Sequence, residues 1–139
     1  MVLEISASDE GLPPVDVVKV QHVIEYLARA IDALRPDFAF VDHYFMNVSG
    51  RIGVDLRTCA WGVTVYGPDL VRKIGKDRLL TAPAYRVEEF PWGGIWLQPE
   101  ENPFLASGES KRRVEEHLGL NERLGESDQF VQKPALRRR

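Results

Sequence analysis

The sequence predicts an α+β fold: a two-layer sandwich with a mostly antiparallel sheet and the helices on one face, loosely ferredoxin-like. Three observations support this prediction. Apolar residues recur at steps of three and four between Val17 and Leu34, which is the spacing of one face of a helix. Four later runs alternate or favour β structure, at 38–45, 58–66, 85–90 and 94–98. The order strand, helix, strand occurs twice, so the helices can cover one layer of paired strands.

The first elements are a short strand and a long helix. Val2–Ile5 favours a strand, and the Gly and Pro residues at 8–14 indicate a loop. The helix is expected to begin at residue 15 or 16 and to end just before Pro36, because proline disfavours helical backbone in the residue that precedes it.

The strand expected at 38–45 places neighbouring side chains on opposite faces of the sheet. Asp42 would share a face with Phe38 and Phe40, whereas His43 would lie on the other face. We therefore do not expect Asp42 and His43 to form a hydrogen-bonded catalytic pair.

The strand expected at 58–66 alternates larger apolar residues with small or polar ones. Its apolar face would consist of Cys59, Trp61, Val63 and Val65. We expect Cys59 to be a small, buried side chain that faces the first helix.

A short second helix is expected after Gly67, because proline in a first turn loses no useful donor and the following aspartate suits the positive helix end. Gly75 is a natural left-handed stop, and residues 76–80 add another helical turn. A hairpin then joins Tyr85–Phe90 to Gly94–Gln98 through a glycine-containing turn.

The last predicted helix begins at Ser110 as its cap and ends near Gly119, with Val114 and Leu118 facing inward. Few apolar residues follow, so the predicted organisation is one domain over 1–125 and a mobile C-terminal tail over 126–139. The length of 139 residues and the hydrophobic content of 44% suit one modest core.

The composition argues against several classes of partner. A net charge of -3, from 21 acidic and 18 basic residues, lacks the basic excess of a nucleic-acid binder. No run approaches the roughly 20 apolar residues of a membrane-spanning helix, and the N-terminus does not resemble a signal peptide. The lone Cys59 cannot form an internal disulfide, which favours a reducing cytoplasm.

No catalytic, metal or cofactor motif is evident in the sequence. The three histidines are scattered, and the adjacent carboxylates Glu88 and Glu89 diverge on a strand. Glu100 and Glu101 lie in an expected loop, so no two carboxylates are predicted to face one space, as acid-base catalysis requires. We therefore expect a protein that is not an enzyme and that uses no cofactor or metal.

The hairpin and the loop after it carry aromatic residues beside carboxylates, a composition common in protein-binding surfaces. The alternative is that most of these aromatic side chains pack into the core. The predicted partner-binding residues, called here the hairpin patch, are Trp92, Phe90, Glu88, Glu89, Trp96, Glu100 and Glu101.

Several motifs resemble the C-terminal half of a family of bacterial immunity proteins linked to polymorphic toxins and type VI secretion. They are Tyr66-Gly-Pro-Asp-Leu-Val-Arg-Lys-Ile-Gly75, Leu79-Leu80, Pro83-Ala-Tyr-Arg-Val87, Gly93-Gly-Ile-Trp-Leu97 and Asn102-Pro-Phe104. The resemblance implies that the chain binds and neutralises a cognate toxin, and it supplies no catalytic residue. The family carries more sheet before the first helix, so a shortened relative is expected, with a sheet edge open to homodimerisation or to a partner strand.

Two alternatives remain at the level of sequence. One is a small ligand-binding domain or enzyme with a pocket near His43, Cys59 and Tyr66. The other is an accessory protein that acts by self-assembly.

Overall fold

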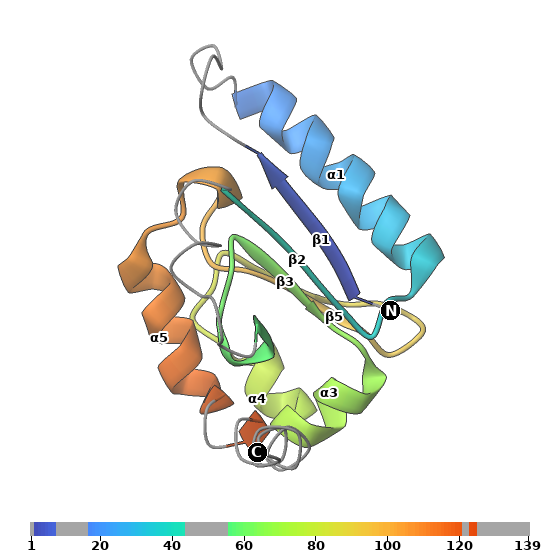
Figure 1. Cartoon of the computed structure of the whole chain (residues 1–139), viewed down its shortest axis with the longest axis vertical. Helices are drawn as coiled ribbons and strands as arrows, with labels where there is room; N and C mark the ends of the chain where they lie inside the picture. Colours follow the sequence, from blue (N-terminus) through green and yellow to red (C-terminus); the bar gives the residue numbers. More distant parts are fainter. Residues whose placement is uncertain (1, 8–16, 44–55, 121–122, 125–139) are drawn as a thin grey trace, which may run out of the picture.

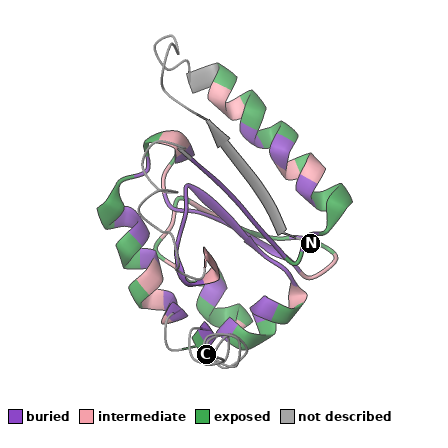
Figure 2. Cartoon of the chain, in the orientation of Figure 1, coloured by how far each residue is buried: buried purple, intermediate pink, exposed green. Residues whose placement is uncertain are grey.

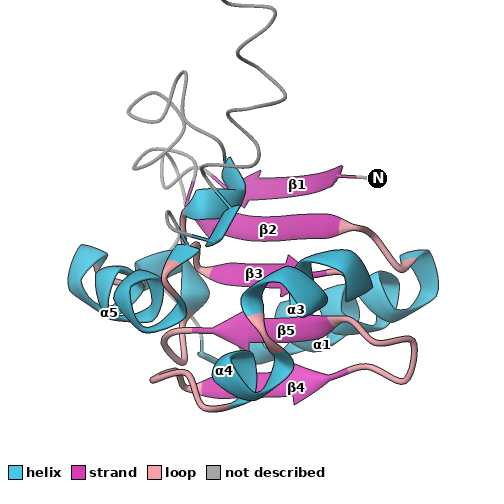
Figure 3. Ribbon diagram, turned by 90° about the horizontal axis from the view of Figure 1, so that it is seen from below, coloured by secondary structure: helices cyan, strands magenta, loops and turns pink. Residues whose placement is uncertain are grey.

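The computed structural model describes residues 2–7, 17–43, 56–120 and 123–124. A five-stranded sheet forms its centre, in the order β1-β2-β3-β5-β4 (Figures 1 and 3). The strands are β1 (Val2–Ala7), β2 (Phe38–His43), β3 (Val63–Tyr66), β4 (Arg86–Glu89) and β5 (Ile95–Gln98). β1 pairs with β2 in parallel, and the three other pairings are antiparallel. The predicted α+β class with a mostly antiparallel sheet is confirmed.

Helices lie on both faces of the sheet, which differs from the single covered face that the sequence predicted. α1 (Val17–Leu34) lies on one face, and α3 (Pro68–Ile74), α4 (Lys76–Leu80) and α5 (Gly108–Leu118) lie on the other (Figures 1 and 3). The expected ferredoxin-like order also differs, because β1 and β2 are direct neighbours, whereas a ferredoxin-like sheet splits its strand-helix-strand unit. The layering is therefore helix, sheet, helices.

Two separate cores follow from the alternation of side chains across the strands. In β2, Phe38 and Phe40 contact the core under α3, α4 and α5, whereas Ala39 and Val41 contact the core under α1. Figure 2 shows the central strands buried, while α1 has one buried stripe and one exposed face. Ile24, Leu27 and Ile31 form that stripe.

The predicted strand at 58–66 is shorter than expected, and this changes the direction of its first side chains. Residues Leu56–Thr58 form a 3-10 turn and β3 begins only at Val63. Cys59 and Trp61 therefore pack in the core of α3, α4 and α5, whereas Val63 and Val65 face α1. The prediction that Cys59 faces the first helix was wrong, although its burial is confirmed.

The predicted boundaries that depend on glycine or proline are close to those observed. α1 ends at Leu34, with Arg35 at φ 50° and Pro36 after it. Gly119 takes the left-handed conformation after α5 and donates its N–H to the carbonyl of Glu115. Ser107, rather than Ser110, caps α5: its side chain accepts from the backbone N–H of Ser110.

The hairpin of β4 and β5 is confirmed, with Gly93 at φ 96° in its turn. The predicted loop at 8–14, the segment 44–55, with the end of the strand predicted at 38–45, and the tail at 126–139 lie outside the described residues.

Candidate functional site

A groove of about 230 Å³ runs between α1 and the edge strand β4. Its lining consists of Glu25, Ala28, Arg29 and Asp32 from α1, and Arg86, Glu88, Glu89, Phe90 and Pro91 from β4 and the hairpin. Three of these residues, Glu25, Asp32 and Glu88, place carboxylates beside the two guanidinium groups, so the formal charge of the groove is -1. Glu89 also lines the groove, but its carboxylate pairs with Lys76 on the α4 side of the sheet. The groove gathers part of the predicted hairpin patch together with α1 residues that the sequence did not single out.

Arg86 joins the two walls of the groove. Its Nη1 donates to Glu25 Oε1 of α1 at 2.8 Å, and its Nη2 donates to Glu88 Oε2 at 2.8 Å. The guanidinium carbon also lies 5.1 Å from the centre of the Trp96 ring, within reach of a cation–π interaction. Partial burial lowers the pKa of Arg86, but the hydrogen bonds to Glu88 and Glu25 outweigh it and the net shift of this pKa is upward.

Trp92 fixes the hairpin turn to the C-terminal half of α1. Its Nε1 donates to Asp32 Oδ1 at 3.0 Å, and its ring stacks on Phe90 with centroids 5.3 Å apart. Trp92 is half-buried and packs against the core under α1. A rigid aromatic group beside carboxylates is suited to contact with another protein.

The other aromatic residues of the hairpin patch are buried. Trp96 is 1% exposed and Phe90 is 7% exposed, and both belong to the core under α1. The alternative that most of the patch aromatics pack inside therefore holds for these two. Both are therefore mainly core residues, although Phe90 also lines the groove.

The four glutamates of the patch lie in four different places. Glu88 lies on the α1 face, whereas Glu89 makes an ion pair with Lys76 of α4 at 2.9 Å, so these neighbours diverge as predicted. Glu101 lines a small recess beside Val20 and Gln21 near the start of α1. The hairpin patch is thus not one continuous surface.

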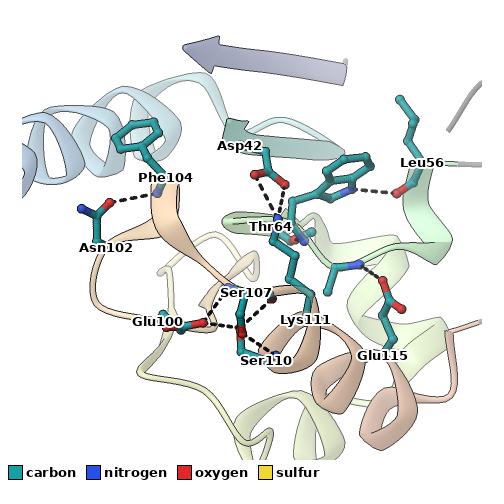
Figure 4. Close-up of polar contacts among 12 residues, drawn as sticks. Asp42, Leu56, Thr64, Glu100, Asn102, Phe104, Ser107, Ser110, Lys111 and Glu115 are labelled. Carbon is teal, nitrogen blue, oxygen red and sulfur yellow. Dashed lines mark hydrogen bonds and ion pairs between the residues drawn. The ribbon is translucent and has the colours of Figure 1, made fainter. Parts of the chain in front are cut away.

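Glu100 caps the start of α5 (Figure 4). Its Oε2 accepts from the backbone N–H of Ser107 at 2.7 Å and from the Ser110 hydroxyl at 2.6 Å. The Ser110 hydroxyl, followed by the Ser107 N–H, holds the pKa of Glu100 below its usual value. The role of Glu100 here is to stabilise a helix end, which needs no partner.

A buried ion pair under α5 was not predicted from the sequence. Lys111 Nζ lies 2.9 Å from Asp42 Oδ2 and 3.1 Å from Oδ1, and the two side chains are 7% and 4% exposed (Figure 4). One signal was available: Lys111 lies three residues before Val114 and seven before Leu118, on the buried stripe of α5.

The alternative pocket near His43, Cys59 and Tyr66 receives no support from the described residues. Cys59 and Tyr66 are 2% and 0% exposed and belong to one packed core, and the side chain of His43 lies outside the described residues. Burial raises the pKa of the Tyr66 hydroxyl, which the nearby Thr64 side chain only partly opposes. Tyr66 Oη has no well-formed hydrogen bond within the described part of the chain.

Within the described ranges, no cluster of three or more His, Cys, Asp or Glu side chains has the arrangement of a metal site. In the same ranges no helix combines the length and apolar character needed to cross a membrane. Comparison with known proteins gave no match to a family model, a curated protein or a solved structure.

Proposed function

We propose that this protein is an immunity-type inhibitor, which binds a cognate bacterial toxin in the cytoplasm and neutralises it by covering its functional surface. The observation that carries the proposal is the carboxylate-rich groove between α1 and β4. The family resemblance of the sequence motifs suggests the kind of partner, and the groove suggests where that partner binds.

The size of the groove favours a macromolecular partner. Small-molecule pockets usually measure about 300–1,000 Å³ and enclose most of their ligand. At about 230 Å³, and open along the edge of the sheet, the groove can accept one or two side chains of a protein better than a whole small ligand. Its dimensions match a contact surface.

The carboxylates of the groove already have hydrogen-bond partners within the chain. Glu25 and Asp32 of α1 accept from Arg86 and Trp92 on the opposite wall, whereas Glu88 accepts from Arg86 on its own strand. A surface already in its bound arrangement loses less side-chain entropy on association, which raises affinity. The excess negative charge would also speed the approach of a basic toxin surface.

The test is coexpression with the toxin encoded beside this protein. We expect the wild-type chain to restore growth and to form a complex with the purified toxin. Glu88→Lys should weaken that complex by about tenfold or more, because it places like charge against a basic partner. If the wild-type chain does not improve survival, the proposal is refuted.

Glu116→Lys is the matched control. Glu116 is an exposed glutamate of α5, on the other face of the sheet, and it also forms a surface ion pair, with Arg112. The substitution makes the same change of charge away from the groove, so rescue and affinity should remain close to wild type. Equal losses in the two variants would show that net charge, and not the groove, controls binding.

A further inference from the structure

We infer that the partner binds by adding an extended, basic segment to the free edge of β4, as a sixth strand of the sheet. The inference rests on the proposed function and specifies its mode of recognition. It combines the hydrogen-bonding pattern of β4 with the charge of the adjacent groove.

β4 is an edge strand, because it pairs with β5 on one side and with no described strand on the other. The backbone N–H of Phe90 donates to the carbonyl of Gly94 at 2.8 Å, which makes these residues a hydrogen-bonded pair. Such pairs alternate along an antiparallel ladder, so Glu88 also bonds to β5. Val87 and Glu89 therefore direct their N–H and C=O groups toward the open edge.

An added strand would lie directly beside the groove. Alternate side chains of a strand point to opposite faces, so every second residue of the added segment would face α1. On that side it would meet the carboxylates of Glu25 and Glu88, each of which already shares Arg86. Lysine or arginine at alternate positions is the chemistry that matches this surface, and the backbone edge supplies the remaining bonds.

A second copy of this chain fits the edge less well in the register that pairs Val87 with Glu89. In an antiparallel pair of two β4 strands centred on one another, the outward residues Val87 and Glu89 would bond to each other. That register places Glu88 directly opposite Glu88 of the copy, and like charges in directly opposed positions are destabilising. Exposed charges on edge strands commonly prevent such self-pairing.

The experiment uses the full chain labelled with ¹⁵N and a capped peptide, acetyl-Lys-Val-Lys-Val-Lys-Val-amide, followed by amide hydrogen exchange. At about 90% occupancy, exchange at Val87 and Glu89 should slow about tenfold, because only the unbound tenth of molecules exchanges freely. Exchange at Glu88 should not change, since that amide already bonds within the sheet. The matching glutamate-valine peptide should have no effect.

Three results would overturn the inference: binding of the basic peptide without slower exchange at Val87 and Glu89, the same response to the acidic peptide, or no response at millimolar peptide. Slower exchange at these amides without peptide, together with a dimeric mass by light scattering, would assign the edge to a second copy instead.

Two variants distinguish the contribution of the outward backbone N–H of residue 89 from that of the Glu89 carboxylate. Glu89→Pro removes an outward N–H without breaking a bond to β5, and it should weaken peptide binding about tenfold. Glu89→Ala keeps that N–H and should stay within about threefold of wild type. Circular dichroism and thermal unfolding establish that both variants fold. Equal affinity of the two variants counts against strand addition.

No toxin is present in these measurements, so they fail or succeed independently of the immunity proposal. If the wild-type chain neutralises the toxin and Glu89→Pro neutralises it equally well, strand addition is wrong while the immunity function stands. If the peptide protects the edge but the wild-type chain gives no rescue, the recognition mode stands and the toxin is not its target.

Discussion

The ion pair between Asp42 and Lys111 offers the sharpest test of how this fold is held together. It joins the end of β2 to α5, and both side chains are almost fully buried. The informative change is Lys111→Met, which keeps the length and apolar stem of the side chain but removes the ammonium group. The carboxylate of Asp42 then remains in a position that water scarcely reaches.

The expected magnitude follows from the geometry. The ammonium lies 3.1 and 2.9 Å from the two carboxylate oxygens. At such separations, an effective dielectric constant of about 20 gives an attraction of about 5 kcal/mol, and desolvation costs several kcal/mol for each ion. The pair is therefore nearly neutral as a whole, whereas removing one member should lower the free energy of unfolding by about 3–4 kcal/mol.

Urea denaturation of the wild type, the two single variants and the double variant measures the net contribution of the ion pair and the cost of removing one member. Lys111→Met alone should also lower the thermal midpoint by about 10 °C in a chain of this length. The double variant Asp42→Val with Lys111→Met removes both charges and should return to within about 1 kcal/mol of the wild type. Arg112→Met is the control, because Arg112 is exposed and its surface pairs should contribute at most about 0.5 kcal/mol.

Two outcomes would refute this reasoning. A loss below about 1 kcal/mol in Lys111→Met would mean that water or the other contacts of Asp42 compensate its carboxylate without Lys111. A double variant as unstable as the single one would mean that the side chains contribute through shape or other bonds, and not through their opposite charges.

Three further predictions concern single side chains, each measured by urea denaturation. Gly62→Ala should cost about 2 kcal/mol or more, because its Cβ would collide with the backbone carbonyl oxygen of Pro103, whereas Gly108→Ala, with open space around it, should stay within about 0.5 kcal/mol. Tyr66→Phe should leave the free energy of unfolding unchanged or raise it by up to about 1 kcal/mol, since it removes a buried hydroxyl that lacks a well-formed hydrogen bond. Glu100→Gln should cost about 1 kcal/mol at pH 7. Because the folded-state pKa of Glu100 is lowered from its usual 4.5, its contribution is complete above that value and is lost as the pH falls through the lowered pKa, so wild type and variant should converge at acidic pH.

The elements of this fold were predictable where the sequence carries local signals. The apolar period of α1 and the positive-φ glycines Gly75, Gly93 and Gly119 act within a few residues, so the helices and the hairpin could be placed from the sequence. The side of the sheet that each helix covers depends on strand order, which no local pattern encodes. The prediction of one covered face failed for this reason.

Burial was harder to predict than secondary structure. The 3-10 turn at 56–58 interrupts the alternation that the sequence suggested, and it sends Trp61 to the opposite face from Val63. Lys111 is a charged residue on an otherwise polar helix, and such residues are almost always solvated. The groove depends on the contact between Glu25 and Arg86, which are 61 positions apart, so only the folded chain reveals it.

The two faces of the sheet have separate roles, and this separation can be tested. The face under α3, α4 and α5 contains the buried ion pair, whereas the face under α1 contributes the groove. Substitutions without shared contacts have additive effects. Lys111→Met should therefore lower the free energy of unfolding while the folded protein keeps its affinity for the partner. Glu88→Lys should lower the affinity and leave the free energy of unfolding unchanged. If the combined variant has the free energy of unfolding of Lys111→Met and the affinity of Glu88→Lys, stability and recognition lie on independent faces. A departure above about 0.5 kcal/mol in either quantity would show that the sheet couples the two faces.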